Sequence, residues 1–198
     1  MFFKIAVFLV IFSFSILGGT LSVNYILNSF ENFGRFTIGK WNTYPQIGTM
    51  ETDPYTRARS AKHGNISLGR TESLIFQLWE DNHGRPLRSH CNYILKGFLP
   101  EARLFTLYTA DKFLKPYIST DAVPFALHTH NIIYENDGSL YIHISPTPQI
   151  GNWLAIVSPE EFGLILTLYD TSIISATELQ KLTMPSLEKI PSGQKNCD

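Results

Sequence analysis

The stretch Phe162-Gly-Leu-Ile-Leu-Thr-Leu-Tyr169 is the most informative segment of this chain about its fold class. Successive side chains along a strand point to opposite faces, so the stretch divides into two sets. One face carries Phe162, Leu164, Leu166 and Leu168, and the other carries Ile165, Thr167 and Tyr169. Both faces are largely apolar, which predicts an inner strand of a packed sheet.

Three other segments have the same apolar and aromatic character. They run from Leu74 to Trp79, from Cys91 to Lys96 and from Arg103 to Tyr108. Turn signals follow two of them, at Asp81-Asn-His-Gly84 and at Gly97. Short strands separated by frequent turn signals are typical of a sandwich or barrel, so the expected fold class is mainly β.

One helix is expected near residue 60. Asp53 can cap it, Pro54 fits its first position, Tyr55 to His63 continue it, and Gly64 ends it. The tetrapeptide Ser158-Pro-Glu-Glu161 matches a capping box and predicts a shorter helical turn.

A hairpin is expected between Phe125 and Ser145, because Asn136-Asp137-Gly138 is a strong turn signal. With Asp137 and Gly138 in the loop, Ile132 pairs with His143. The side chains of His128, His130 and His143 then share one face of the hairpin.

The N-terminal segment has no charged residue between Lys4 and Glu31. A membrane-spanning helix needs about 20 mostly apolar residues, and residues 5–26 satisfy this. The alternatives are a cleaved signal peptide, for which Gly19-Thr20-Leu21-Ser22 is a poor cleavage site, and a buried soluble helix. We favour an uncleaved anchor in residues 1–29, followed by one domain in residues 30–198.

The orientation of this anchor follows from weak signals. Lys4 and the terminal amine lie on one side, and Arg35 and Lys40 lie on the other. The positive-inside rule therefore gives little preference for either orientation of the anchor. The very short leading tail favours a cytoplasmic N-terminus. The expected location is the bacterial inner membrane, crossed once, with the C-terminal domain in the periplasm.

Two cysteines, Cys91 and Cys197, fit an oxidising compartment, where disulfides persist. A bridge between them would stabilise the domain and hold the C-terminal tail. The alternative is two separate thiols. With two cysteines this far apart, a structural zinc site is not expected.

Charged residues make up 17% of the chain, and the net charge is −1. Lysine, arginine, aspartate and glutamate are mixed along the sequence, with no basic stripe. Nucleic acid is therefore not an expected partner.

The ordered motifs of the chain resemble the domain-of-unknown-function 1214 family, in its short membrane-anchored form. They are Asp53-Pro-Tyr-Thr-Arg-Ala58, Leu68-Gly-Arg70 with Glu72, Gly84-Arg-Pro-Leu87, Cys91-Asn-Tyr93, Pro100-Glu-Ala-Arg103, Gly151-Asn-Trp-Leu154 and Leu166-Thr-Leu-Tyr-Asp170. The resemblance covers about Gly39 to Cys197. It implies a jelly-roll-like antiparallel β-sandwich and brings no established reaction.

The sharpest chemical constellation is His128-Thr-His130 with His143. Two histidines on one strand face and a third from the neighbouring strand can hold zinc and leave a position for water. The alternative is a solvated polar strand face.

A second group of candidates lies around the expected helix. Tyr55, Arg57, Arg70 and Glu72 are ligand-binding candidates, because arginine suits recognition of carboxylate or phosphate. The alternative is a structural ion pair between Arg57 and Glu72. Trp153 is a further candidate, either closing a pocket or packing at the end of the sandwich.

These observations favour a membrane-anchored envelope protein of unknown activity, acting as a non-catalytic binding or assembly module that faces the periplasm. Its expected partners are the membrane, through the N-terminal helix, and an envelope protein or small ligand. No cofactor is expected. The alternative is a periplasmic hydrolase using zinc or another divalent metal at His128, His130 and His143.

Overall fold

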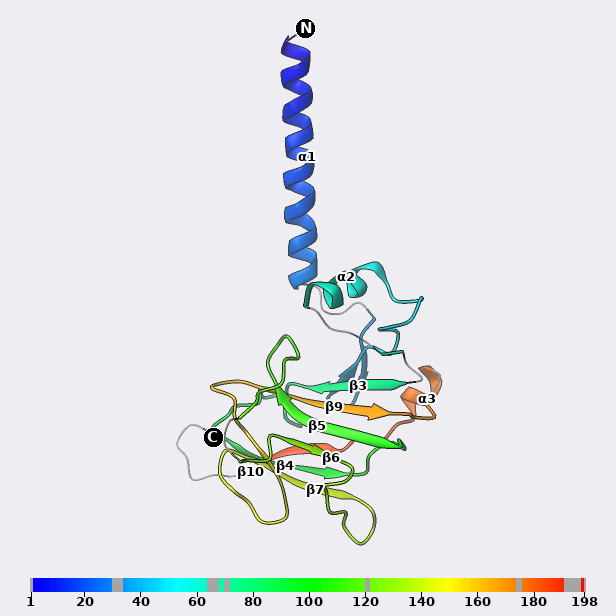
Figure 1. The fold of residues 1–198 in the computed structure, drawn as a ribbon, viewed down its shortest axis with the longest axis vertical. Coiled ribbons are helices and arrows are strands. Elements are labelled where there is room, and N and C mark those ends of the chain that lie inside the picture. The colour runs from blue at the N-terminus through cyan, green and yellow to red at the C-terminus, as the bar shows by residue number, and fades with distance from the viewer. Residues whose placement is uncertain are drawn as a thin grey trace.

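The computed structural model describes residues 2–29, 34–63, 68–69, 72–119, 122–173, 176–190 and 197. A long N-terminal helix, α1 (Phe2–Ser29), precedes a domain built mainly of two β-sheets. Figure 1 shows α1 standing clear of this domain, with the sheets stacked below its C-terminal end. The mainly β class expected from the sequence is confirmed.

Within the described residues, α1 is the one helix long and apolar enough to cross a membrane. The qualifying segment, Phe2–Leu27, has 26 residues and a mean hydropathy of 2.2, with none of its tested window buried. At about 1.5 Å per residue, it is longer than the roughly 30 Å hydrocarbon core of a bilayer. Inside it, the hydroxyl of Ser15 donates to Ile11 O at 2.9 Å. An anchor and a signal sequence share these properties.

The larger sheet has six strands in the order β1-β2-β3-β9-β5-β6, and all its pairs are antiparallel. Its strands are β1 (Phe36–Ile38), β2 (Trp41–Thr43), β3 (Ser73–Leu78), β9 (Gly163–Tyr169), β5 (Leu104–Ala110) and β6 (Ala126–His128). Residues 163–169, the apolar stretch after Phe162, form β9, which lies between β3 and β5 with six of its seven residues buried. The predicted inner strand is confirmed.

The smaller sheet has four strands in the order β10-β4-β7-β8. They are β10 (Ser186–Ile190), β4 (Asn92–Gly97), β7 (Leu140–Ser145) and β8 (Asn152–Ala155). The pair β7–β8 is parallel, so this sheet is mixed rather than purely antiparallel. A short helix, α3 (Ala176–Gln180), precedes β10.

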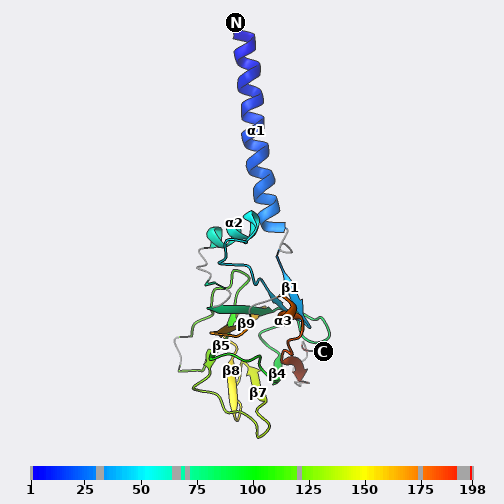
Figure 2. The same ribbon diagram turned by 90° about the vertical axis from the view of Figure 1, so that its right-hand side faces the viewer.

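The core fills the space between the two sheets, which Figure 2 shows as two layers. Phe76, Leu166 and Leu107 stand side by side on the inner face of the larger sheet. They belong to the same buried cluster as Leu95 and Ile142 of the smaller sheet. Burial of this apolar surface at about 25 cal/mol per Å² supplies the main stabilisation of the domain.

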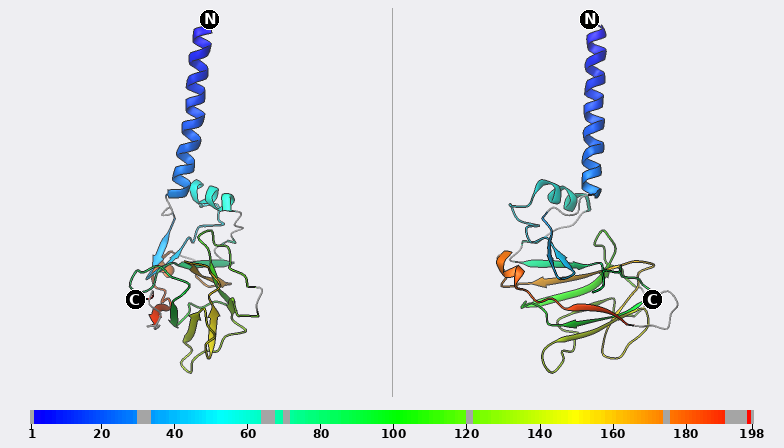
Figure 3. Two further views of the ribbon diagram at one scale, coloured as in Figure 1. Left: turned by 90° about the vertical axis from the view of Figure 1, so that its left-hand side faces the viewer. Right: turned by 180° about the vertical axis from the view of Figure 1, so that it is seen from behind.

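The helix expected near residue 60 is confirmed as α2 (Pro54–His63). Asp53 caps it, because Asp53 Oδ1 accepts the backbone N–H groups of Tyr55 and Thr56, both at 3.0 Å. Gly64, the expected end signal, lies outside the described residues. α2 lies at the foot of α1 (Figure 3), where Lys62 Nζ donates to Asn24 Oδ1 at 3.1 Å.

The predicted hairpin between Phe125 and Ser145 is wrong. Its turn forms, with Gly138 N donating to Glu135 O at 2.9 Å, but β6 pairs with β5 and β7 pairs with β4 and β8. The segment around Ile133, which was expected to pair with β7, forms hydrogen bonds with the side chain of Asn152 instead. The amide of Asn152 accepts from Ile133 N at 2.7 Å and donates to Ile133 O at 2.6 Å.

The helical turn predicted at Ser158–Glu161 is also wrong. The hydroxyl of Ser158 donates to Glu161 O at 3.0 Å, whereas a capping serine would accept a backbone N–H. Pro159 and Glu160 form a bend and Glu161 forms a β-bridge with Arg88, so no helical turn is present in this segment.

Candidate functional site

A two-lobed cleft, here called the α2 cleft, lies between α2 and the outer face of the larger sheet. The lobes measure about 190 Å³ and about 200 Å³. Both are lined by Tyr44, Ile47, Ser60, Gln77 and Leu114, so they form one continuous depression. Figure 1 shows α2 between the foot of α1 and strands β3, β9 and β5, so the cleft is on the side of the domain nearest α1.

The floor of the cleft is a row of side chains across three strands. Gln77 of β3 pairs with Ile165 of β9, which pairs with Tyr108 of β5. Ile165 faces away from the core between the sheets, yet its exposed fraction is 0% because the layer that contains α2 covers it. The apolar outer face of β9, visible in the sequence, therefore contributes to this cleft.

One wall of the cleft is the indole of Trp79. A Cβ atom at Gly163 would lie 2.5 Å from Trp79 Cζ3, so the ring occupies the space above this glycine. Trp79 Nε1 donates to Gln77 Oε1 at 3.4 Å, which links the wall to the floor. The absence of a side chain at Gly163 thus leaves space for the indole ring that forms this wall.

A second wall comes from the turn that follows β5. Leu114 N donates to Asp111 O at 2.9 Å, and Leu114 has a φ of 63°. An ordinary residue in this left-handed conformation loses about 1–2 kcal/mol. Leu114 lines both lobes. A strained residue with its side chain at a pocket is a reason to look for function there.

The two lobes differ in charge. One lobe, the cationic lobe, is lined by Arg59 and Lys112, and no carboxylate is among its described lining residues. The other, the uncharged lobe, has no ionisable acid or base other than tyrosine among its described lining residues. Its apolar residues include Pro45, Leu74 and Ile75.

The charge of Arg59 reaches the cap of α2. Burial pushes the pKa of Asp53 upward, but hydrogen bonds from Thr56 and Tyr55 and the charge of Arg59 outweigh burial and lower the pKa. The carboxylate that caps α2 is therefore held in its charged form, and it keeps the helix that forms the upper wall of the cleft in place.

Two of the ligand-binding candidates from the sequence, Tyr55 and Arg57, belong to α2 and lie outside the lining of the cleft. Tyr55 is 40% exposed. Arg57 Nη2 donates to Met50 O at 3.3 Å and to Thr52 O at 3.4 Å, so this guanidinium braces the preceding loop. The lining residues of α2 are instead Thr56, Arg59 and Ser60.

Glu72, another member of that candidate group, is not among the described residues that line the cleft. Glu72 is exposed, and among the described residues no ion pair joins it to Arg57. Its backbone carbonyl accepts from Asp170 N at 3.1 Å. Arg70 lies outside the described residues.

The three histidines are not brought together. His128 ends β6 in the larger sheet, whereas His143 lies in β7 of the smaller sheet. The rings of His128 and His130 are 6.0 Å apart, and His143 packs edge-on against Tyr141 at 5.2 Å. They are not among the described groups whose ligand atoms lie within 4.8 Å of one another. The shared strand face on which the zinc hypothesis depended does not form.

Trp153 lies on the outer face of the smaller sheet, beside His143 in the register of β7 and β8. Its indole N–H donates to Ser145 O at 3.0 Å, across the return from β7 to β8. The structure therefore places this candidate on a different sheet from the α2 cleft.

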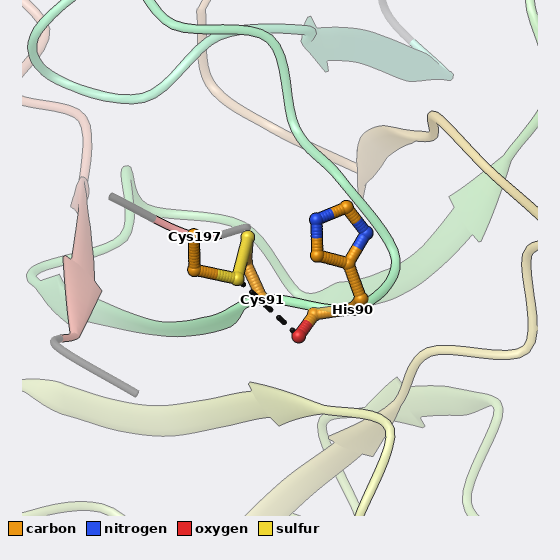
Figure 4. Close-up of side chains that lie close together, drawn as sticks. All are labelled: His90, Cys91 and Cys197. Carbon is orange, nitrogen blue, oxygen red and sulfur yellow. Dashed lines mark hydrogen bonds between the residues drawn. A yellow bond between two sulfur atoms is a disulfide. The ribbon is translucent and has the colours of Figure 1, made fainter. Parts of the chain in front are cut away.

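Cys91 and Cys197 are joined by a disulfide with a Cα–Cα distance of 5.6 Å. Figure 4 shows the bridge beside His90, whose carbonyl oxygen lies 3.4 Å from Cys197 Sγ. The possible ligand atoms of His90, Cys91 and Cys197 lie within 4.8 Å of one another. Metal binding by cysteine requires thiolates, and the disulfide leaves none, so the role of these cysteines here is to tie Cys197 to the start of β4.

The helix, the paired sheets and the α2 cleft define a class of protein: a β-domain that follows a single apolar helix and carries a cleft close to that helix. A family model described as "Protein of unknown function (DUF1214)" matches residues 72–173, from the residue before β3 to just beyond β9. The chain belongs to this family.

Two solved structures extend the comparison. The VPA0106 protein from Vibrio parahaemolyticus matches with a TM-score of 0.61 and 14% identity over 88% of this chain and 43% of that chain. An uncharacterized protein from Burkholderia cenocepacia matches with a TM-score of 0.45 and 10% identity over 60% of this chain and 29% of that chain. The chain thus spans less than half the length of either, and the first likeness concerns the fold alone. No curated protein matches the sequence.

Proposed function

We propose that this protein is a membrane-tethered, non-catalytic binding module, and that the α2 cleft is its ligand site. α1 anchors it in the bacterial inner membrane, and the β-domain faces the periplasm. The observation that carries the proposal is the position of α2. One side of α2 lines the cleft through Thr56 and Ser60, and Lys62 of the same helix bonds to Asn24 of α1.

The lining of the cleft suits recognition of a small molecule. Binding sites for small molecules are concave and mostly apolar, with a few polar groups that fix orientation. Here the sheet supplies an apolar floor at Ile165, α2 supplies a hydroxyl at Ser60, and Gln77 supplies an amide. These groups come from elements far apart in sequence that the fold brings together.

The experiment is native mass spectrometry of the full chain, extracted from its membrane with a polymer that keeps lipid around α1. We expect one additional small mass per chain in the unsubstituted protein. Ser60 lines both lobes, so Ser60→Phe should fill the cleft and remove that mass.

The matched control is Ala58→Phe, which adds the same ring on the exposed side of α2. This variant should keep the bound mass. A bound mass that persists in Ser60→Phe, or a chain that never carries one, would contradict the proposal.

A further inference from the structure

We infer that the ligand of the α2 cleft is a single-chain amphiphile with an anionic head group. This inference rests on the proposed function and adds the chemical class of the ligand. The aliphatic chain lies in the uncharged lobe and the head group lies in the cationic lobe, and Leu114 lines both at their junction.

The uncharged lobe fits a hydrocarbon chain. Its floor and walls include Ile75, Ile165 and Leu114, which offer dispersion contacts and no charge that would need hydration. Apolar surface that leaves water on binding stabilises a complex by roughly 25 cal/mol per Å². A charged group placed in this lobe would lose its hydration without gaining an ionic partner among the described lining residues.

The cationic lobe fits the acidic end of the same molecule. Arg59 and Lys112 reach it from different elements, α2 and the turn after β5, so their charges converge on one volume. The hydroxyl of Ser60 lines the same lobe as Arg59 and adds a hydrogen-bond donor. Charge-assisted hydrogen bonds of this kind favour carboxylate, phosphate or sulfate over a neutral or cationic head.

The size of the uncharged lobe limits the chain length. The lobe measures about 200 Å³, which favours a short aliphatic chain over a long one. A chain of about eight carbons is therefore the probe.

Lys112 offers a clean test of the head-group contact. It is exposed at the tip of its turn, and its ammonium lies 5.1 Å from the centre of the Phe113 ring. Lys115 is exposed in the same turn and does not line either lobe. Lys112→Gln and Lys115→Gln therefore make the same chemical change inside and outside the cleft.

The experiment uses the full chain in nanodiscs of zwitterionic phosphatidylcholine, with 2-bromooctanoate as a quencher of tryptophan emission. The bromine next to the carboxylate should lie beside Trp79 in the cationic lobe. We expect saturable quenching that disappears in Trp79→Phe and persists in Trp153→Phe. Octanoate should compete with the probe, whereas octanol and octyltrimethylammonium should compete at least tenfold less well.

The lysine variants test the charge. Lys112→Gln should weaken binding about three- to tenfold, as expected for one partly solvated charged contact, and Lys112→Arg should restore it. Lys115→Gln should leave binding unchanged. Nanodiscs that also contain lysophosphatidylglycerol, an anionic lipid with one chain, identify the source of the ligand. Loss of quenching there indicates that a single-chain bilayer lipid occupies the cleft, and unchanged quenching indicates a free amphiphile.

Two failures are distinguishable. If octanol or octyltrimethylammonium competes as well as octanoate, the cleft binds a ligand but the anionic class is wrong, and the proposed function stands. If none of the probes reaches Trp79 in a folded protein that also carries no bound mass from its own membrane, both the inference and the proposed function are wrong.

Discussion

The indole ring of Trp79 lies directly over Gly163, so that a Cβ atom added at this glycine would come within 2.5–2.7 Å of three ring atoms. The contact joins the strand at the centre of the larger sheet to the wall of the α2 cleft. A stretch that reads as core in the sequence therefore also shapes the cleft.

Gly163→Ala should destabilise the domain and impair the cleft together. The added methyl group would force Trp79 out of its position, at a cost of about 1–3 kcal/mol for overpacking. Denaturant unfolding measures the free energy, and quenching by 2-bromooctanoate measures the cleft. Gly69→Ala is the control, because a Cβ there would meet no atom within 4 Å and φ is not in the left-handed region. Equal stability of both variants would show that Trp79 moves at no cost.

Removing the Leu114 side chain should weaken ligand binding with little loss of stability. Leu114→Gly removes a half-buried side chain but relieves a φ of 63°, so we expect the free energy of unfolding to change by less than about 1 kcal/mol. Ligand binding should nevertheless fall. Ile47→Gly also removes an apolar side chain that lines both lobes, without relief of a positive φ, and should cost clearly more stability. Leu114→Gly that is as unstable as Ile47→Gly would contradict this account.

Asp81 should make the domain sensitive to acid. Its side chain is 1% exposed, and Arg85 Nε donates to it at 2.7 Å. Burial pushes the pKa of Asp81 upward, but hydrogen bonds from Arg85 and His83 outweigh burial and lower the pKa below 3.8. Because the folded-state pKa is lowered, the stabilisation is present above the unfolded-state value of about 3.9 and is lost as pH falls through the folded-state pKa.

Asp81→Asn tests this directly. It should lower the free energy of unfolding at pH 7 by about 1–3 kcal/mol, because the amide cannot reproduce the charge-assisted hydrogen bonds. It should also flatten the loss of stability between about pH 5 and pH 2. Unfolding curves across this range measure both effects. A variant whose acid sensitivity matches that of the parent would assign the effect to other carboxylates.

The disulfide should carry a large share of the stability of the domain. Cys91 and Cys197 are separated by 106 residues, and closing a loop of this length stabilises by about 4–5 kcal/mol in the chain-entropy model. The double variant Cys91→Ser with Cys197→Ser should lose roughly 3–5 kcal/mol. Thermal unfolding of the parent with and without a thiol reductant provides the comparison. A melting temperature that the reductant does not change, with the bond shown to be cleaved, would contradict the estimate.

The sequence determined which segments are strands better than which strands pair. The run of apolar residues from Leu164 to Leu168 indicates an inner strand, because a strand that is buried on both faces is apolar at nearly every position. The alternation along β7 gives its faces but not its neighbours. The turn at Asn136-Asp137-Gly138 therefore suggested a local partner. The long-range partners β4 and β8, and the clamp formed by Asn152, took its place.

The α2 cleft could not be predicted from the sequence. Its lining residues come from the loop before α2, from α2, from β3 and from the turn after β5, and only the fold brings them together. One signal was present: Thr56, Arg59 and Ser60 have the spacing of a single helix face. Arg57, which the sequence favoured, does not line the cleft and bonds to loop carbonyls.

The tether is tested most directly by the intact mass of the chain recovered from membranes washed with alkaline carbonate. Both the location of the protein and the closeness of the α2 cleft to the bilayer depend on an α1 that stays attached. We expect the whole chain, at 22.5 kDa, to remain in the washed membrane. A soluble chain that lacks the residues up to about Gly19 would contradict the account, because α1 would then be a signal sequence.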